Sequence, residues 1–369
     1  MKKEDVYLYF SPATDTTGRK LADTLGISQT DSGKKGTTSP PKKAKMIIGW
    51  GPKTVENVSF PKGTVVLNHP NSVRGNRNKL LALEAMKAAG VNVADFQATD
   101  KNFELTLPVI GRTKYHQGGK GFWDCPTKTH VNDAIGAGAQ YLQELIEIKD
   151  EFRLHVFGDE VLYGVKKVKR SNEEFEKAFI EDEFARQKKL WEKNNKGEFN
   201  EEQAMEILRR QAKNAAQGGP NMMIRSNKMG WKFSRITKYD ENLVKEAVKA
   251  LKALGLDFGA VDCCIDPTGK AFIIEVNTGP GLEGTPFEKY IETFTKIITD
   301  GGVKKKDGGP VTGKSAGDAD KSDANMKAKI EAQLLSKQFG KFQKQLDECD
   351  DPVALNTLRS VGAAMFGGQ

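Results

Sequence analysis

Three oxygen-bearing side chains in the second half of the sequence have a spacing that suits metal binding. Glu275 and Asn277 lie two residues apart in the apolar run 271–277, and alternate residues of a strand point to the same face. Asp262 lies in a second strand-like run, 259–265, which a short Pro/Gly turn joins to the first. The two runs therefore predict a β-hairpin that carries three potential ligands.

The turn from Asp266 to Lys270 sets the register of this hairpin. If Asp266 pairs with Ala271, Asp262 falls opposite Glu275, and all three side chains share one face. Hard cations such as Mg²⁺ take such oxygen ligands, usually together with nucleotide phosphates. The alternative is a hairpin with incidental polar residues, but carboxylates are costly to bury without a partner. We therefore predict a metal site formed by Asp262, Glu275 and Asn277.

A glycine-rich basic loop, residues 111–121, follows a predicted strand at 107–110. Backbone N–H groups of such loops can bind phosphate, and Arg112 and Lys120 would add positive charge. Loops of this composition are common, and this one matches neither the Walker loop nor the dinucleotide fingerprint. By itself the loop only permits a phosphate site.

The remaining reactive side chains do not form a recognisable catalytic group. The four histidines are scattered, and no Ser/His/Asp arrangement is identifiable. Of the four cysteines, Cys263 and Cys264 are adjacent in a predicted core strand, which favours small buried apolar side chains over a redox pair. The final Gly-Gly-Gln369 is interpreted as a tail.

Composition restricts the class of protein. The 369 residues are 38% hydrophobic and 29% charged, as expected for a soluble globular protein of two or three packed units. Polar residues follow Met1-Lys-Lys and no apolar run is long enough for a membrane, so we expect neither a signal peptide nor a membrane span. The cysteines show no C-x-x-C or metal-binding spacing, which favours a reduced cytoplasm. The net charge of +8 suits nucleic acid, ATP or an acidic substrate, but the lysine-rich tracts lie in predicted loops, which disfavours a nucleic-acid groove.

Strands and helices alternate over roughly the first seventy residues, which favours an open α/β domain. Strands are expected at 6–10, 46–50, 64–67, 107–110, 141–146, 151–157 and 161–168, with 141–146 and 151–157 as a pair. Helices are expected at 18–25, 78–90, 241–254 and 288–299, and a loop at 68–72. Residues 171–217 are predicted to be a charged helical block with Phe175, Phe179, Phe184, Leu190 and Trp191 on its apolar side.

The order of these elements resembles the ATP-grasp superfamily of carboxylate–amine ligases, and most of all its ribosomal-protein glutamate ligases. The resemblance runs from about Asn68 to Thr299 and is most specific at Gly255–Asp262 and Glu275–Gly284. It implies an α/β (α+β) fold in which two antiparallel-sheet subdomains sandwich ATP behind an N-terminal open α/β domain. The expected divisions are 1–75, 76–142, 143–300 with the insertion 171–217, a linker at 301–325, and a C-terminal helix and tail at 326–369.

The resemblance also implies roles for individual residues. Asp262, Glu275 and Asn277 fall at the family's Mg²⁺ ligands, with Glu275 bridging two ions and Mn²⁺ as an alternative metal. The segment that holds adenine matches Glu144 and Leu145, and the acid on the ribose matches Glu151. The phosphate contacts match Lys79, Arg112, Lys120, Arg225, Ser226 and Asn227.

This chain departs from the family pattern in two places. Arg112 stands where the family usually has lysine, and arginine keeps the charge but changes the geometry of a phosphate contact. The block 171–217 is longer than the corresponding connection in glutamate ligases and falls where it could border the acceptor site. The family's substrate is therefore not transferred to this chain.

The implied chemistry has two steps. A carboxylate attacks the γ-phosphate of ATP to form an acyl phosphate, and an amine then displaces phosphate. Arg112, Lys120 and Arg225 would stabilise charge on the transferred oxygens, and the glycine-rich loop would exclude water. The substrates would be ATP, a carboxylate and an amine, the latter two on an amino acid, peptide or protein tail.

The sequence also leaves two other functions open. The chain could be an ATP-binding regulatory or structural protein that has lost turnover, which the Arg112 substitution allows. It could also be a factor that acts on nucleic acid, which only the basic pI of 9.0 suggests. Residues 326–369 could bind a protein partner in each case, and the sequence leaves the oligomeric state open.

Overall fold

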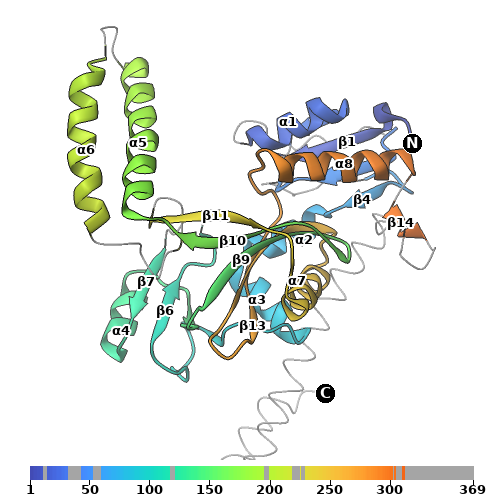
Figure 1. Cartoon of the computed structure of the whole chain (residues 1–369). Coiled ribbons are helices and arrows are strands. Elements are labelled where there is room, and N and C mark those ends of the chain that lie inside the picture. Colours follow the sequence, from blue (N-terminus) through green and yellow to red (C-terminus); the bar gives the residue numbers. More distant parts are fainter. Residues whose placement is uncertain are drawn as a thin grey trace, which may run out of the picture.

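The computed structural model describes residues 1–10, 15–31, 43–52, 60–116, 121–194, 199–217, 225, 229–301, 303–304 and 310–311. Within these residues it has a four-stranded parallel sheet and two antiparallel sheets of four and five strands, packed with helices (Figure 1). The predicted mixed α/β fold is thus confirmed. The predicted C-terminal helix within 326–369 and most of the linker lie outside the described residues.

The N-terminal sheet is parallel and has the strand order β2-β1-β3-β4. Its elements are the 3-10 helix η1 (Lys3–Asp5), β1 (Val6–Phe10), α1 (Thr16–Leu25), β2 (Ser28–Asp31), β3 (Met46–Gly49) and β4 (Val65–Leu67). The Asp15 side chain caps α1 by accepting from the amide of Gly18, and Gly26 ends the helix in the left-handed region. The apolar strands β1 and β3 are fully buried, as their sequences predict.

A second unit contains a four-stranded antiparallel sheet with the order β5-β8-β6-β7. Its elements are α2 (Pro70–Arg77), α3 (Lys79–Ala88), β5 (Phe96–Ala98), β6 (Val109–Arg112), β7 (Phe122–Cys125), α4 (Lys128–Gly136) and β8 (Tyr141–Glu144). The predicted loop at 68–72 is wrong beyond His69, because Pro70 occupies the first turn of α2, where its fixed φ suits a helix.

The largest sheet is antiparallel and has the order β11-β10-β9-β12-β13. Its strands are β9 (Asp150–Phe157), β10 (Glu160–Lys169), β11 (Trp231–Ile236), β12 (Phe258–Ile265) and β13 (Ala271–Asn277). Helix α7 (Glu241–Ala253) packs on one face, where Leu154, Val261 and Ile273 form a core with Leu243 and Leu251. The predicted pairing of 141–146 with 151–157 is wrong, since β8 and β9 belong to different sheets.

Between β10 and β11, which are neighbours in the large sheet, the chain forms a helical hairpin. It consists of α5 (Asn172–Asn194) and α6 (Glu201–Gln217), which pack against each other and stand clear of the rest of the molecule (Figure 1). Helix α5 has no fully buried residue, and Leu190 and Trp191 stay 51% and 37% exposed. The predicted charged helical block is therefore confirmed as helical, and it projects from the molecule as a hairpin (Figure 1). Its predicted apolar side is only partly buried.

The N-terminal sheet docks tightly against the large sheet. Helix α8 (Thr285–Thr299), which follows β13, packs beside α1 on the N-terminal sheet. Trp50 is fully buried and stacks on Phe258, at 5.7 Å between ring centroids. The two units thus share one aromatic core. Two short β-strands, β14 (Val303–Lys304) and β15 (Pro310–Val311), form a separate pair.

Candidate active site

The β12–β13 hairpin places Asp262 directly opposite Glu275, as predicted. The pairing next to the turn is one residue away from the prediction, because Ile265 rather than Asp266 pairs with Ala271. The register then shifts between Cys263 and Asp262, where Ile274 is an extra residue in β13. This β-bulge compensates for the first difference and turns Glu275 toward the face of Asp262.

Asn277 completes the group of three side chains. Its amide nitrogen lies 3.4 Å from Oδ2 of Asp262 and 3.2 Å from Oε1 of Glu275. Turning the amide by half a rotation would present its oxygen instead. Burial acts to raise the pKa of Glu275, but Lys79, the Asn277 amide, His116 and Arg153 together lower this pKa to about 2. Glu275 is thus a carboxylate at neutral pH.

Both carboxylates are neutralised by cations of the chain itself. Arg153 on β9 donates two hydrogen bonds to Asp262, at 2.6 and 2.8 Å, and the Nζ atom of Lys79 lies 3.4 Å from Glu275. This bidentate pair raises the pKa of Arg153 above its ordinary value against the opposing effect of burial. Sequence reasoning missed the pair, because the local sequence pattern does not show that β9 and β12 are neighbours.

The donor set of this group fits a hard divalent cation. Two carboxylates and an amide oxygen are ligands that Mg²⁺ and Mn²⁺ accept. Within the described part of the chain there is no group of three His, Cys, Asp or Glu side chains that could hold a metal, so Asn277 is needed as the third donor. An ion bound here would compete with Arg153 and Lys79 for the two carboxylates.

The predicted ribose acid, Glu151, lies two residues before Arg153 on the same face of β9. It is buried and forms an ion pair with Lys167 of β10, and the Nε atom of Arg225 lies 3.8 Å from its other oxygen. Burial raises the pKa of Glu151, and Lys167 opposes this effect. Arg225 also donates to the carbonyl of Ile148 at 2.8 Å, so two residues predicted to bind nucleotide lie together.

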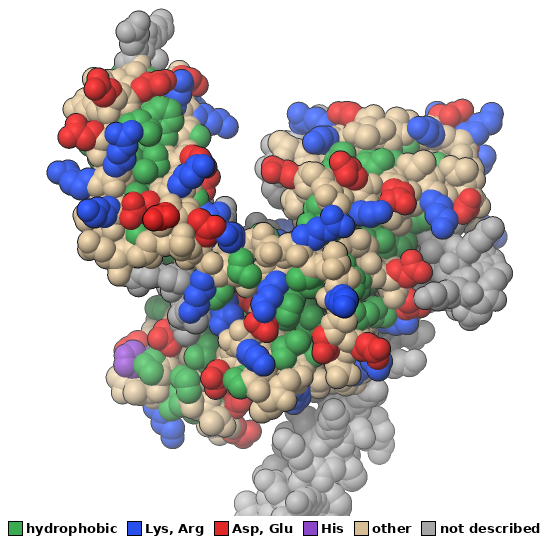
Figure 2. All heavy atoms as spheres, viewed as in Figure 1, with side chains coloured by type: hydrophobic (Ala, Val, Ile, Leu, Met, Phe, Trp, Pro, Cys, Tyr) green, Lys and Arg blue, Asp and Glu red, His purple; other side chains and the backbone are tan. Residues whose placement is uncertain are grey.

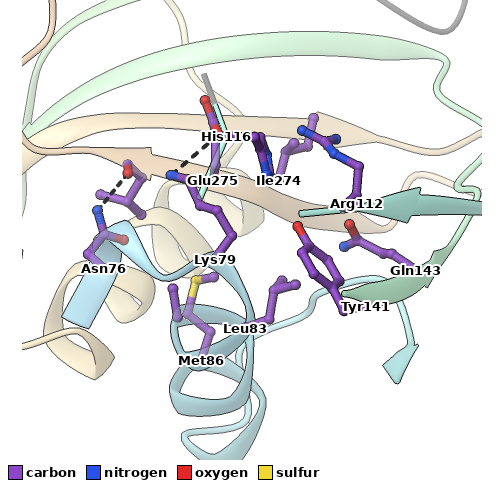
Figure 3. A pocket seen from close by; sticks show the side chains of 12 residues that line it. Asn76, Lys79, Leu83, Met86, Arg112, His116, Tyr141, Gln143, Ile274 and Glu275 are labelled. Carbon is purple, nitrogen blue, oxygen red and sulfur yellow. Dashed lines mark hydrogen bonds and ion pairs between the residues drawn. The ribbon is translucent and has the colours of Figure 1, made fainter. Parts of the chain in front are cut away.

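A small cavity lies between α3, β13 and the second sheet (Figure 3). Lys79 and Glu275 line it from one side, and Arg112, His116 and Tyr141 line it from the other. Burial lowers the pKa of Arg112 and of His116 and raises the pKa of Tyr141 to about 12. The imidazole Nδ1 of His116 lies 2.7 Å from the carbonyl of Thr113. Sequence reasoning did not select His116, because a lone histidine in a loop carries no spacing signal.

The predicted adenine segment lies at the end of β8. The amide of Leu145 donates to the carbonyl of Pro108 at 3.1 Å, and the amide of Glu144 donates to the carbonyl of Asp95 at 2.8 Å. The Glu144 carboxylate accepts from the amide of Thr106 at 2.7 Å. A purine held here would therefore not use these two amides in the arrangement that the structure has.

Three of the predicted site residues cannot be located in the structure. Lys120, Ser226 and Asn227 lie outside the described residues. The structure brings Asp262, Glu275 and Asn277 together, and Glu151 and Arg225 form an adjoining group. Arg112 and Lys79 line the cavity beside Glu275. Glu144 ends β8 of the second sheet and Leu145 follows it, and neither residue lines the cavity.

Comparison with known proteins gives only distant matches. No family model and no curated protein matches the chain. Among solved structures it is similar to the ATP-grasp ligase PsnB complexed with a minimal precursor, at 12% identity and a TM-score of 0.49, over 81% of this chain and 99% of that one. It is also similar to D-alanine–D-alanine ligase from Bacillus anthracis, at 10% identity and a TM-score of 0.48, over 80% and 98% of the two chains.

A third similar structure is the macrocyclase MdnC bound with precursor peptide MdnA from Microcystis aeruginosa MRC. It has 12% identity and a TM-score of 0.46, over 80% of this chain and 99% of that one. Separately, no helix in the described part of this chain is both long and apolar enough to cross a membrane.

Proposed function

We propose that this chain is an ATP-dependent ligase that joins a carboxylate to an amine through an acyl phosphate. The observation that carries the proposal is the convergence of Asp262, Glu275 and Asn277 on the face that also bears Glu151 and Arg153. A site with three oxygen donors beside several cations suits a phosphorylated nucleotide and its metal.

Asp262, Glu275 and Asn277 would hold two Mg²⁺ ions. When bound, these ions neutralise phosphate charge and help to align the reacting groups. Lys79 and Arg153, which now pair with the carboxylates, are then available for anionic oxygens of the substrates. Arg112 faces the same space and has no hydrogen-bond partner for its Nε atom among the described residues.

The nucleotide would extend from these cations toward Glu151. A carboxylate at that position can accept hydrogen bonds from the ribose hydroxyls, and Lys167 and Arg225 keep Glu151 oriented. Ser226 and Asn227 follow Arg225 directly in the sequence and are assigned to the same end of the site. The carbonyl groups of Glu144 and Leu145 would accept from the adenine amino group, since their amides are already bonded.

The reaction needs no nucleophile from the protein. The substrate carboxylate forms a bond to the γ-phosphorus as the bond to the ADP oxygen breaks. The amine then attacks the acyl carbon, phosphate leaves with its oxygen, and the amine releases a proton. Arg112, Lys120 and Arg225 are assigned to stabilise the anionic oxygens in these steps. The loop at 111–121 is assigned to exclude water from the acyl phosphate.

The substrate acid and amine are proposed to belong to an amino acid, peptide or protein tail in the cytoplasm. The three described cysteines are free and buried, which suits a reducing compartment.

The Asp262–Arg153 ion pair favours one second candidate, an ATP-binding protein without turnover. If Arg153 never releases Asp262, the metal site stays closed and no phosphate is transferred. A screen of amino acids and peptides for substrate-dependent ADP release, with mass spectrometry of the product, separates the two. A ligase releases ADP in repeated turnover only when an acid and an amine are both present. A protein without turnover releases no ADP with any acid and amine, and this result, or ADP release that does not depend on them, would contradict the proposal.

A further inference from the structure

One row of directly paired residues crosses all five strands of the large sheet. From β13 to β11 it contains Glu275, Asp262, Arg153, Val165 and Arg235. Directly paired residues in antiparallel strands share a face, so Arg235 lies on the face of the metal ligands. The row begins with two acids, continues with an arginine and ends with a second arginine at the sheet edge.

Arg235 is not used by the proposed nucleotide site. It is exposed, and its guanidinium lies 5.8 Å from the ring of Tyr163. In the part of the chain that the structure describes, no carboxylate forms an ion pair with it. Asp262, in the same row, pairs with Arg153 instead. Arg235 therefore offers an unneutralised charge on the active face.

Phe233 provides an apolar neighbour on the same face. It pairs with Lys167, and its ring is 48% exposed, which is unusual for so large a side chain on a sheet. The guanidinium of Arg153 lies 5.3 Å from the ring centroid, and Lys167 lies 6.0 Å from it. This ring thus lies between the inner arginine and the sheet edge and is open to a ligand.

Charge is segregated along this face. Over β12 and β13 the face has carboxylates, whereas over β9, β10 and β11 it has Arg153, Lys167 and Arg235. Two acids also lie on this part of the face, the buried Glu151 and Glu160 at the start of β10. The helical hairpin and the N-terminal unit rise on either side of β10 and β11, with open space between them (Figures 1 and 2). An elongated anionic ligand has room to reach the sheet edge from this space.

The length of the row sets the size of that ligand. Neighbouring strands are about 4.8 Å apart, so four spacings from Glu275 to Arg235 amount to about 19 Å. An extended peptide advances about 3.4 Å per residue. A ligand that contacts both ends therefore needs about six residues, which a single amino acid does not supply.

We propose that Arg235 and Phe233 form a recognition subsite for an acidic peptide whose reacting carboxylate lies at Asp262, Glu275 and Asn277. Arg235 binds an acidic side chain of that peptide, and Phe233 contacts the aliphatic part of a neighbouring side chain. This inference rests on the proposed ligase function and adds the substrate class. Peptide is favoured over nucleic acid because the reaction at the other end of the row consumes a carboxylate.

The test is binding of a fluorescent hexaglutamate peptide, followed by anisotropy in the presence of Mg²⁺ and a non-hydrolysable ATP analogue. Hexaglutamine of the same length and a six-nucleotide oligothymidylate are the comparison ligands. We expect Arg235→Glu to weaken hexaglutamate binding about tenfold or more, because a like charge replaces an opposite one. Arg235→Lys should stay within about threefold of the original protein.

Lys245→Glu is the matched control, since this lysine is exposed on α7, which packs on the opposite face. It makes the same charge change and should leave hexaglutamate affinity as it is. Equal affinity for hexaglutamate and hexaglutamine, or equal effects of Arg235→Glu and Lys245→Glu, would overturn the inference. So would an Arg235-dependent preference for the oligonucleotide.

A separate titration of the unaltered protein with the ATP analogue distinguishes failure of the proposed ligase function from failure of the peptide subsite. If the analogue fails to bind, the proposed function fails. If the analogue binds with Mg²⁺ but the peptide preference is absent, only the assignment of Arg235 and Phe233 is lost.

Discussion

At the scale of single residues, the site depends on how its carboxylates are neutralised before any substrate arrives. Asp262 is 6% exposed and its partner Arg153 is 27% exposed, so this ion pair is largely shielded from water. Removing one partner of such a pair leaves the other charge buried and uncompensated. The arginine is therefore expected to stabilise the fold as well as the site.

We predict that Arg153→Met lowers the free energy of unfolding by about 3 kcal/mol in the absence of divalent cations. Added Mg²⁺ should recover part of this loss, because an ion bound to Asp262 replaces the missing charge. Urea denaturation with and without Mg²⁺ measures both effects. A loss that Mg²⁺ does not change, in a variant that still folds, would argue against Asp262 as a metal ligand.

The burial of His155 makes the stability of the fold depend on pH, and it fixes the direction of that dependence. Desolvation, with a contribution from Arg153, lowers the pKa of His155 to about 4. Below its ordinary value of about 6.5 the unfolded chain binds a proton that the folded chain does not, so stability falls as the pH decreases from there toward 4. The ring packs between Tyr163 and Tyr290, so a phenylalanine can replace it.

We expect the unfolding free energy of the original protein to fall by about 2 kcal/mol more than that of His155→Phe between pH 7 and pH 5. Denaturation of both proteins at the two pH values, without metal, measures the difference. Identical pH dependences would show that folding does not change the pKa of the imidazole.

At the scale of elements, the bulge at Ile274 controls which face Glu275 occupies. If Ile274 were paired in regular alternation after Ile273 instead of bulging, Glu275 would turn toward the core under α7, since a shift of one residue exchanges the two faces of a strand. The bulge sends Val276 into the core instead, where it is buried.

This register predicts opposite outcomes for two single-residue changes. Deleting Ile274 joins Ile273 directly to Glu275 and keeps Glu275 opposite Asp262, so Mg²⁺-dependent nucleotide binding should survive with a modest loss of stability. Inserting one alanine between Ile274 and Glu275 should abolish that binding, because Glu275 then no longer lies opposite Asp262. Fluorescence titration with an ATP analogue compares the two, and equal retention in both would contradict the role of the bulge.

The hairpin also shows how far the sequence could carry the prediction. Alternation within β13 and the turn after β12 were enough to place Asp262 opposite Glu275, because two errors of one residue cancelled. The Arg153 pair and the bond from Leu145 to Pro108 were not predictable, since both depend on which strands become neighbours. The wrong pairing of 141–146 with 151–157 has the same cause, because local sequence patterns do not specify to which sheet a strand belongs.

At the scale of the whole molecule, the N-terminal unit is fixed to the turn that follows the metal ligands. Gly51 has φ of +53°, and a Cβ there would lie 3.2 Å from the Cα of Gly279. Asn68 also lies in the left-handed region. Its side-chain nitrogen donates to the Phe258 carbonyl at 2.9 Å, and its side-chain oxygen accepts from the Asp257 amide at 2.8 Å. The position of the metal ligands is therefore coupled to the N-terminal sheet.

We predict that Gly51→Ala lowers the free energy of unfolding by about 2 kcal/mol, from backbone strain together with the close contact. Gly63→Ala is the matched control, because Gly63 has φ of +82° but nothing within 4 Å of the added Cβ. Thermal denaturation should show the larger loss for Gly51→Ala. An equal loss in both variants would mean that the contact with Gly279 contributes nothing to docking.

The central claim is that the face with Asp262, Glu275 and Asn277 binds ATP through a divalent cation. Isothermal titration with a non-hydrolysable ATP analogue, in Mg²⁺ and in EDTA, tests it without knowledge of the acid or amine. The control is Glu292→Gln, which makes the same change at an exposed position of α8. We predict that Mg²⁺ strengthens binding about a hundredfold in the original protein and in this control, and has no effect in Glu275→Gln. Equal Mg²⁺ dependence in Glu275→Gln would contradict the account.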